Sequence, residues 1–126
     1  KSVEYAGADS VSLVNTFLAM KIDIKTKKPL LGNTFGGLSG AAIMPIALRM
    51  VYQVYKALNI PIVGMGGIQK YEDALEFIMA GASVVSIGSG IFSNPLLPLE
   101  IIKQMNNYLG ENNINNIKDL IGVAHL

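Results

Sequence analysis

The sequence predicts an α/β fold with a parallel sheet, organised as the C-terminal part of a (β/α)8 TIM barrel. Short apolar segments rich in valine and isoleucine alternate with segments of helical periodicity, which is typical of strands buried on both faces of a parallel sheet. An internal repeat also matches "AGADSVSL" at 6–13 with "AGASVVSI" at 80–87. Equivalent strand and helix units are expected in a barrel, so the repeat favours one over a doubly wound sheet. Chance similarity of Ala/Gly/Val-rich sequence is the alternative.

Three strands, three main helices and a short last helix follow from the pattern. Glycines and prolines bound them: Pro45 suits the first turn of a helix, and Gly81 and Gly110 each follow the end of one. The opening residues are typical of the last turns of a helix ended by Gly7, so we expect the chain to begin inside a fold. The expected strands span 10–15, 60–65 and 83–88, and the expected helices span 45–58, 71–80, 96–109 and 117–121.

Three strands cannot close a barrel, which takes about eight strands and roughly 250 residues. We therefore expect residues 1–126 to form the C-terminal portion of a single barrel domain, with about strands 6–8 and their helices. Such a portion on its own leaves a strand edge and an apolar face exposed, which favours aggregation.

Composition excludes several classes of function. A net charge of +1 with 15% charged residues offers no footprint for nucleic acid, and no apolar stretch approaches the roughly 20 residues of a membrane span. The chain has no cysteine and one histidine, so we expect no metal site, and we expect His125 to be an ordinary tail residue. The basic segment Lys21–Lys28 is expected to be a solvated loop. With no signal peptide in the sequence, we expect a cytoplasmic protein.

Two glycine clusters follow the second and third expected strands. "GMGG" at 64–67 and "GSGIFSNP" at 88–95 lie where a barrel commonly binds phosphate, because the loops after its last strands offer backbone N–H groups. The first cluster lacks the third glycine of a dinucleotide fingerprint. Loops that only cap helices also use glycine, so two clusters on successive strands indicate phosphate more than either does alone.

Polar residues follow the first strand. Asn15 carries an amide that can offer a donor and an acceptor to a planar heterocycle, although a turn is the simpler role for Asn15 and Thr16. A long polar segment at 21–42 then precedes the next helix, and a loop of that length is usually functional. It ends in a glycine-rich run whose backbone a flat cofactor could approach.

Taken together, four stretches closely resemble the class 1B dihydroorotate dehydrogenases, the FMN-containing catalytic subunits of pyrimidine synthesis. These are "VNTFLAMKIDIKTKKPLLGNTFGGLSG", "PIALRMVYQVYK", "IPIVGMGG" and "AGASVVSIGSGIFSNP". The resemblance runs over nearly the whole chain. Class 1A enzymes differ after the asparagine and carry threonine at the position of Met65, so class 1B is favoured.

The resemblance implies roles for particular residues. Asn15 and Thr16 would contact the pyrimidine, Val14 would lie against the flavin, and Gly40 would approach FMN. The residues implied to hold the FMN phosphate are Gly66, Gly67, Gly88 and Ser89. The family usually has threonine at the position of Ser89, and serine keeps both the hydroxyl and the backbone donor. Ala41 and Met44 replace a usual proline and lysine without removing a known ligand.

The resemblance also implies the reaction: oxidation of dihydroorotate to orotate, with hydride transfer to the flavin while a base removes a ring proton. The family's base is a cysteine, which this chain lacks, so no catalytic residue is assigned here and the base is expected in an N-terminal part. Electrons would pass to NAD through a partner subunit carrying FAD and an iron–sulfur cluster. The implied assembly is a homodimer within a heterotetramer.

Two other interpretations remain open at this point. The chain could belong to another FMN- or phosphate-binding barrel enzyme, since such barrels share the two glycine loops. It could also be a non-catalytic half-barrel that serves binding or assembly.

Overall fold

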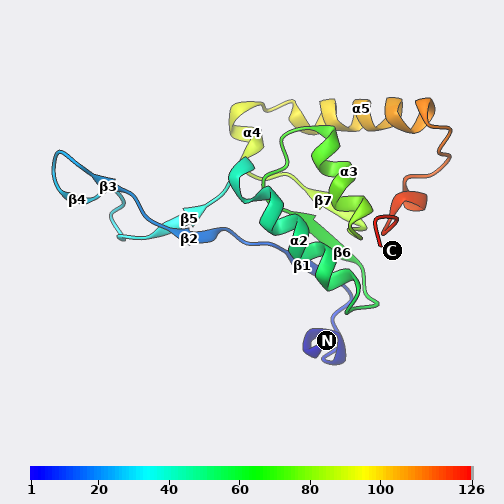
Figure 1. The fold of residues 1–126 in the computed structure, drawn as a ribbon, viewed down its shortest axis with the longest axis horizontal. Helices are drawn as coiled ribbons and strands as arrows, with labels where there is room; N and C mark the ends of the chain where they lie inside the picture. The colour runs from blue at the N-terminus through cyan, green and yellow to red at the C-terminus, as the bar shows by residue number, and fades with distance from the viewer. Residues whose placement is uncertain (126) are drawn as a thin grey trace.

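The fold is built on a three-stranded parallel sheet, as the sequence predicts. The computed structural model describes residues 1–125, so the predicted domain of residues 1–126 includes one residue outside the described part. The strands are β1 (Val11–Leu13), β6 (Ile62–Met65) and β7 (Val84–Ser86), in the order β1-β6-β7 (Figure 1). The register places Leu13 opposite Gly64 and Gly64 opposite Val85.

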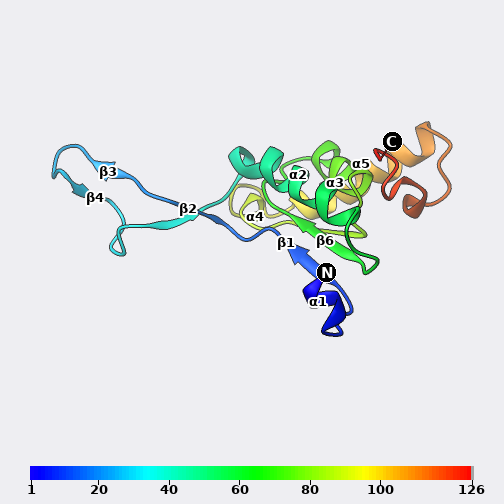
Figure 2. The ribbon, with the colours of Figure 1, turned by 60° about the horizontal axis from the view of Figure 1, so that its bottom comes forward.

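Helices cover one face of this sheet. α2 (Met44–Tyr55) and α3 (Tyr71–Met79) pack on the strands, and α5 (Leu97–Glu111) packs on α3 (Figure 2). Gly64 allows the close approach of α3, because a Cβ there would lie 2.8 Å from the ring of Phe77. The central core consists of buried apolar side chains: Val14, Ile43, Ala47, Val51, Ile62, Ile68, Ala74, Phe77, Ala80, Ala82, Leu97 and Ile101. The three predicted main helices are confirmed to within three residues at each end.

The opposite face of the sheet is bare. Ile62 on the helix side is 1% exposed, whereas Val84 on the other side is 56% exposed. Within residues 1–125, β1 and β7 each pair only with β6, so both edges of the sheet are open. An apolar hollow of about 560 Å³ runs along β7 beside α5. These are the open edges and the uncovered inner face expected of part of a barrel.

A long arm replaces the loop predicted at 21–42, and this prediction was wrong. Two antiparallel pairs form it: β2 (Phe17–Ala19) with β5 (Gly36–Leu38), and β3 (Ile22–Asp23) with β4 (Lys28–Pro29). The strands have two or three residues, and β5 is mostly glycine, so no alternating pattern marks them in the sequence. The pairing is also distant along the chain, since Phe17 faces Leu38.

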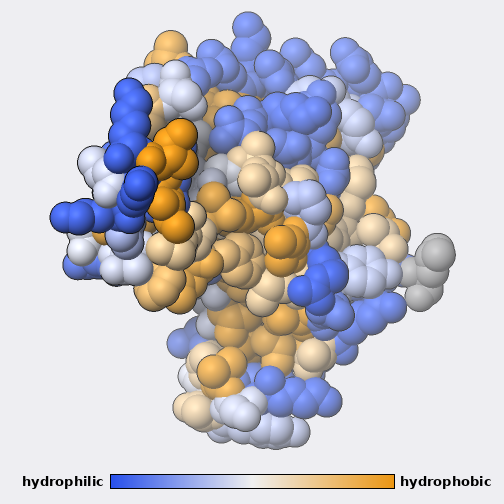
Figure 3. Space-filling model, turned by 60° about the vertical axis from the view of Figure 1, so that its left-hand side comes forward, coloured by the Kyte–Doolittle hydropathy of each residue, from blue (hydrophilic) through white to orange (hydrophobic). Residues whose placement is uncertain are grey.

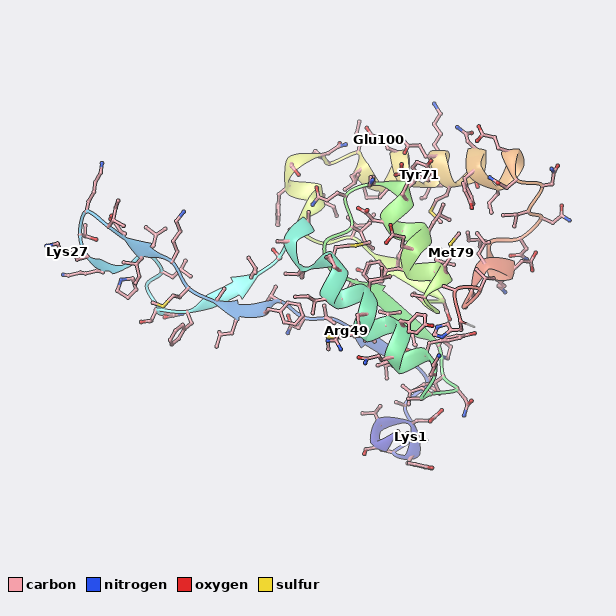
Figure 4. The ribbon with its side chains drawn as sticks, in the orientation of Figure 1. Lys1, Lys27, Arg49, Tyr71, Met79 and Glu100 are labelled. Carbon is pink, nitrogen blue, oxygen red and sulfur yellow. The ribbon has the colours of Figure 1, made fainter. Side chains whose placement is uncertain are left out.

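The arm extends away from the helices, with Lys27 at its far end (Figures 1 and 4). Lys21, Lys25, Lys27 and Lys28 are all exposed, as predicted for a solvated segment. Hydrogen bonds from the backbone of Lys25 and the side chain of Thr26 hold the pKa of Asp23 below its ordinary value. Apolar surface gathers across the middle of the face seen from the arm side (Figure 3). The exposed apolar side chains of the arm include Leu18, Met20, Ile22, Ile24, Leu30, Leu31, Phe35 and Leu38.

Short helical turns complete the chain. α1 (Ser2–Tyr5) ends before Gly7, η1 (Ala41–Ile43) leads into α2, α4 (Gly90–Ser93) follows β7, and η2 (Ile117–Leu120) is the predicted last helix. None of the helices described in residues 1–125 combines the length and apolarity needed to cross a bilayer.

His125 differs from the ordinary tail residue that the sequence predicts, because its ring is packed. The imidazole stacks on Tyr52 with ring centroids 3.9 Å apart, and its Nε2 lies 2.9 Å from the carbonyl oxygen of Ala80. Gly122, with φ of +76°, turns the chain so that Ala124 N–H donates to the carbonyl of Met79. The C-terminal segment is thereby held on the ends of α2 and α3.

The bare face makes a prediction for the 126-residue chain studied alone. Open strand edges and uncovered apolar side chains favour intermolecular pairing, so sedimentation velocity should show association that grows with protein concentration. Val84→Lys places a charge on the uncovered face without entering the core, and it should shift the distribution toward smaller species. A concentration-independent monomer that unfolds cooperatively would contradict this prediction.

Candidate functional site

A cavity of about 750 Å³ lies at the carboxyl ends of the three parallel strands. This is the end at which barrels and open α/β sheets bind ligands. The cavity is lined by Ser12, Val14, Asn15, Thr16, Ser39, Ile43, Met65, Gly66, Gly67, Ser86, Ile87, Gly88, Ser89, Ile91 and Phe92. Seven of the eight residues singled out in the sequence are among them, and the eighth, Gly40, is adjacent.

The loop after β6 is closely packed where it forms the cavity wall. Gly66 and Gly67 have φ of +127° and +84°, a region that residues with a side chain rarely adopt. A Cβ at Gly67 would lie 2.7 Å from the carbonyl oxygen of Gly40 and 2.9 Å from the backbone nitrogen of Met44. Glycine is therefore required at 67 by its conformation and by its neighbours. The same contact joins Gly40 to this loop.

The loop after β7 forms the adjacent wall. Gly88 and Ser89 lead into α4, and a Cβ at Gly90 would lie 3.1 Å from the carbonyl oxygen of Ile68, so the two loops lie against each other. A Cβ at Gly88 would meet nothing within 4 Å. The Cβ position of Gly88 is therefore open space, and Gly88 itself lines the cavity.

Four backbone donors at this wall lack an acceptor. Within residues 1–125, the N–H groups of Gly66, Gly67, Gly88 and Ser89 donate to no protein atom. Backbone N–H groups without a protein partner at a cavity wall favour an anion, because an unmade hydrogen bond in a partly enclosed site costs free energy. The wall can therefore hold a group with several acceptor oxygens.

The segment after β1 forms the opposite side of the cavity. Val14 N–H donates to the carbonyl of Met65 at 3.0 Å, which continues the parallel ladder one residue past β1. Val14 is 8% exposed, while Asn15 and Thr16 are exposed to the cavity. The Oδ1 of Asn15 accepts the Thr16 N–H at 2.8 Å. That bond is a local turn contact, and it leaves the Asn15 Nδ2 group free to donate to a ligand.

Several lining residues were not singled out in the sequence. Ile43, Met65, Ile87, Ile91 and Phe92 give the cavity apolar walls. Ser12 and Ser86 add hydroxyls, and they occupy equivalent positions in the two copies of the internal repeat. The repeat was therefore the signal that could have identified both serines.

The cavity holds no acid–base group of this chain. None of its lining residues is Asp, Glu, His, Lys, Arg, Cys or Tyr. His125 lies outside it, hydrogen-bonded at the end of α3. Among residues 1–125, no three His, Cys, Asp or Glu side chains come together as metal ligands. The arrangement binds and orients a ligand, and proton transfer would need a group from elsewhere.

Comparisons with known proteins agree on one family. A family model described as dihydroorotate dehydrogenase matches residues 1–109. The catalytic subunit of dihydroorotate dehydrogenase B (NAD(+)) from Brachyspira hyodysenteriae is 78% identical over all 126 residues, and the subunit of the same name from Desulforamulus reducens is 58% identical. The chain spans 42% and 41% of the length of these two relatives.

Solved structures show the same likeness in three dimensions. The crystal structure of DHODH from Eimeria tenella in complex with ferulenol superposes with a TM-score of 0.80 at 27% identity, over 98% of this chain and 33% of that protein. The ligand-free structure from the same organism gives a TM-score of 0.78. The partial-barrel fold is therefore supported independently of the sequence pattern.

Gly67→Ala and Gly88→Ala should differ in their effect on stability. The first forces alanine into a positive φ and against backbone atoms, so it should lower the free energy of unfolding by at least about 1 kcal/mol. The second enters open space and should change it by no more than about 0.5 kcal/mol. Both changes in the free energy of unfolding can be measured by urea unfolding of a full-length protein that contains this chain. Equal effects would contradict the packing described for Gly67.

Proposed function

Because this chain belongs to the dihydroorotate dehydrogenase family, we propose that it forms the cofactor- and substrate-binding part of a cytoplasmic enzyme that oxidises dihydroorotate to orotate in pyrimidine biosynthesis. The observation that carries the proposal is that four residues whose N–H groups have no protein acceptor, and Asn15 with its amide, all line one cavity of about 750 Å³. The cavity offers an anion site on one wall and a hydrogen-bonding edge on the other. Those are the needs of a phosphorylated cofactor and a planar pyrimidine.

The phosphate of FMN is proposed to bind at Gly66, Gly67, Gly88 and Ser89. No lysine or arginine lines the cavity, so backbone N–H groups would supply the hydrogen bonds to the phosphate. Gly88 supports this assignment because its Cα faces open space in which phosphate oxygens can approach the backbone. The Ser89 hydroxyl is a further donor in this wall.

The flavin ring is proposed to lie against Val14 and near Gly40. Val14 is buried beside Met65, and Ile43 continues the same apolar wall. A flat aromatic ring suits such a wall, because burying apolar area is favourable. When bound, FMN supplies the hydride acceptor of the reaction.

The substrate is proposed to bind at Asn15 and Thr16. The Thr16 N–H holds the Asn15 Oδ1, and this leaves the Nδ2 group as a donor for a ring carbonyl. The Thr16 hydroxyl can donate or accept beside it. These residues orient the pyrimidine relative to the cofactor, and they remove no proton.

The catalytic base is proposed to come from another part of the polypeptide. The cavity lining offers no group that titrates near neutral pH, and the chain has no cysteine to fill the role of the family's base. Residues 1–125 would contribute binding and orientation, and a group from another part of the polypeptide would remove the proton at the cavity.

Electron transfer is proposed to continue to NAD through a partner subunit that carries FAD and an iron–sulfur cluster. Both relatives are named as the catalytic subunit of dihydroorotate dehydrogenase B (NAD(+)), which supports a division of labour between subunits. The chain's lack of cysteine agrees with a cluster held elsewhere. We propose that two copies form a homodimer within the heterotetramer.

Gly88→Glu should abolish flavin retention in the full-length protein. A Cβ at 88 meets no atom within 4 Å, so a glutamate should be accepted there, and its carboxylate would repel the phosphate while the fold is kept. Gly88→Gln has nearly the same size without the charge and should retain much more FMN. Absorbance at the flavin band relative to protein gives the stoichiometry. A yellow Gly88→Glu protein with normal stoichiometry would rule out this phosphate site.

Asn15→Asp should weaken orotate while leaving FMN bound. Aspartate keeps an acceptor for the Thr16 N–H, but it loses the Nδ2 donor and places a negative charge beside an anionic ligand. A lost hydrogen bond to a buried polar group costs about 1–3 kcal/mol, so affinity should fall about tenfold or more. Titration of the flavin spectrum with orotate measures the affinity.

The same substitution at exposed Asn106 on α5 is the control, and its orotate affinity should match the parent's. Unchanged affinity in Asn15→Asp would leave Asn15 with only its turn contact. A parent protein whose bound flavin is not reduced by dihydroorotate would instead favour another FMN-binding barrel enzyme.

A further inference from the structure

The base of the arm joins two segments that line the cavity. β2 begins directly after Asn15 and Thr16, and β5 ends directly before Ser39. In this antiparallel pair Phe17 faces Leu38 and Leu18 faces Gly37. The position of Asn15 and Thr16 therefore depends on the pairing of β2 with β5, although no residue of these two strands lines the cavity.

Gly37 lies so close to Thr16 that a side chain at 37 would collide with it. A Cβ at 37 would lie 2.7 Å from the Cβ of Thr16 and closer still to its hydroxyl. Rotating the Thr16 side chain cannot relieve the first contact, because the position of a Cβ is fixed by the backbone. The backbone of Gly37 is in a region open to other residues, since its φ is not positive, so the contact alone requires glycine.

Gly36 offers a comparison in the same strand. A Cβ at 36 would also lie 2.7 Å from a carbon, but that carbon is the Cδ1 of Leu31, and the next atom is 3.9 Å away. Leu31 is 42% exposed, so its methyl group can swing into solvent. Neither glycine lines the cavity.

We propose that Gly37 is a positioning residue for the substrate site: its missing side chain lets the Thr16 backbone lie where its N–H fixes the Asn15 amide. A side chain at 37 pushes Thr16 away from β5 and strains the 2.8 Å bond from Thr16 N–H to Asn15 Oδ1. The Asn15 amide then loses the orientation that presents Nδ2 to the ligand. The phosphate wall belongs to the loops after β6 and β7, so it is unaffected.

The consequence for the enzyme rests on the proposed function, whereas the coupling between Gly37 and Thr16 does not. The test therefore compares Gly37→Ala with Gly36→Ala in the full-length protein by two measurements. Hydrogen exchange of the peptide that contains Thr16 reports the bond to Asn15 without any ligand. Orotate titration of the bound flavin reports the substrate site.

Gly37→Ala should speed exchange at Thr16 and weaken orotate about tenfold, with FMN stoichiometry unchanged. Gly36→Ala should match the parent in all three. The inference is overturned if Gly37→Ala exchanges and binds as the parent does, or if both variants change equally, since the effect would then belong to the arm as a whole. A parent that binds no orotate contradicts the proposed function, and the exchange comparison still decides the role of Gly37.

Discussion

The site depends on the parallel ladder between β1 and β6 and on its continuation past the end of β1. The Val14 N–H bond to the Met65 carbonyl is the last rung, and it comes directly before the two residues proposed to hold the pyrimidine and beside the glycines proposed to hold the phosphate. Asn15, which follows Val14, and Gly66, which follows Met65, are therefore positioned by the same hydrogen bonding that builds the sheet. The core beneath it, where Val14, Ile43 and Ala47 are buried, keeps the rung from moving.

Glycines allow the close backbone contacts that shape the cavity walls. Gly67 brings the loop after β6 onto the backbone around Gly40, and Gly90 brings the loop after β7 onto Ile68. Gly37 does the same for Thr16 at the base of the arm. At each point backbone meets backbone or a Cβ, so these contacts cannot be adjusted by a change of rotamer. The resulting walls are stiff, and stiff walls hold unpaired N–H donors in place for a ligand.

The bare face of the sheet and the exposed arm are expected of a chain that spans less than half the length of its relatives. Val84 on the uncovered face is 56% exposed, and apolar residues of the arm are exposed as well. The chain covers 42% of the length of a relative with which it shares 78% identity. The cavity is consequently built from only part of the polypeptide that the relatives possess, and the proposed base would belong to the remainder.

The sequence by itself determined the strands, the helices and the glycine loops, because each leaves a local signal: valine and isoleucine runs, helical spacing, and glycine or proline at the ends. It also placed six cavity residues, Asn15, Thr16, Gly66, Gly67, Gly88 and Ser89, since parallel strands put their carboxyl ends together once the alternation is recognised, and the family resemblance added Val14. Only the tertiary structure decided the arm, where β2 and β5 pair across a long interval with no alternating pattern. The same holds for the contact of Gly37 with Thr16 and of Gly67 with Gly40. Such contacts join residues far apart in the chain, and a glycine looks the same in the sequence whether its missing side chain faces solvent, as at Gly88, or a neighbouring backbone.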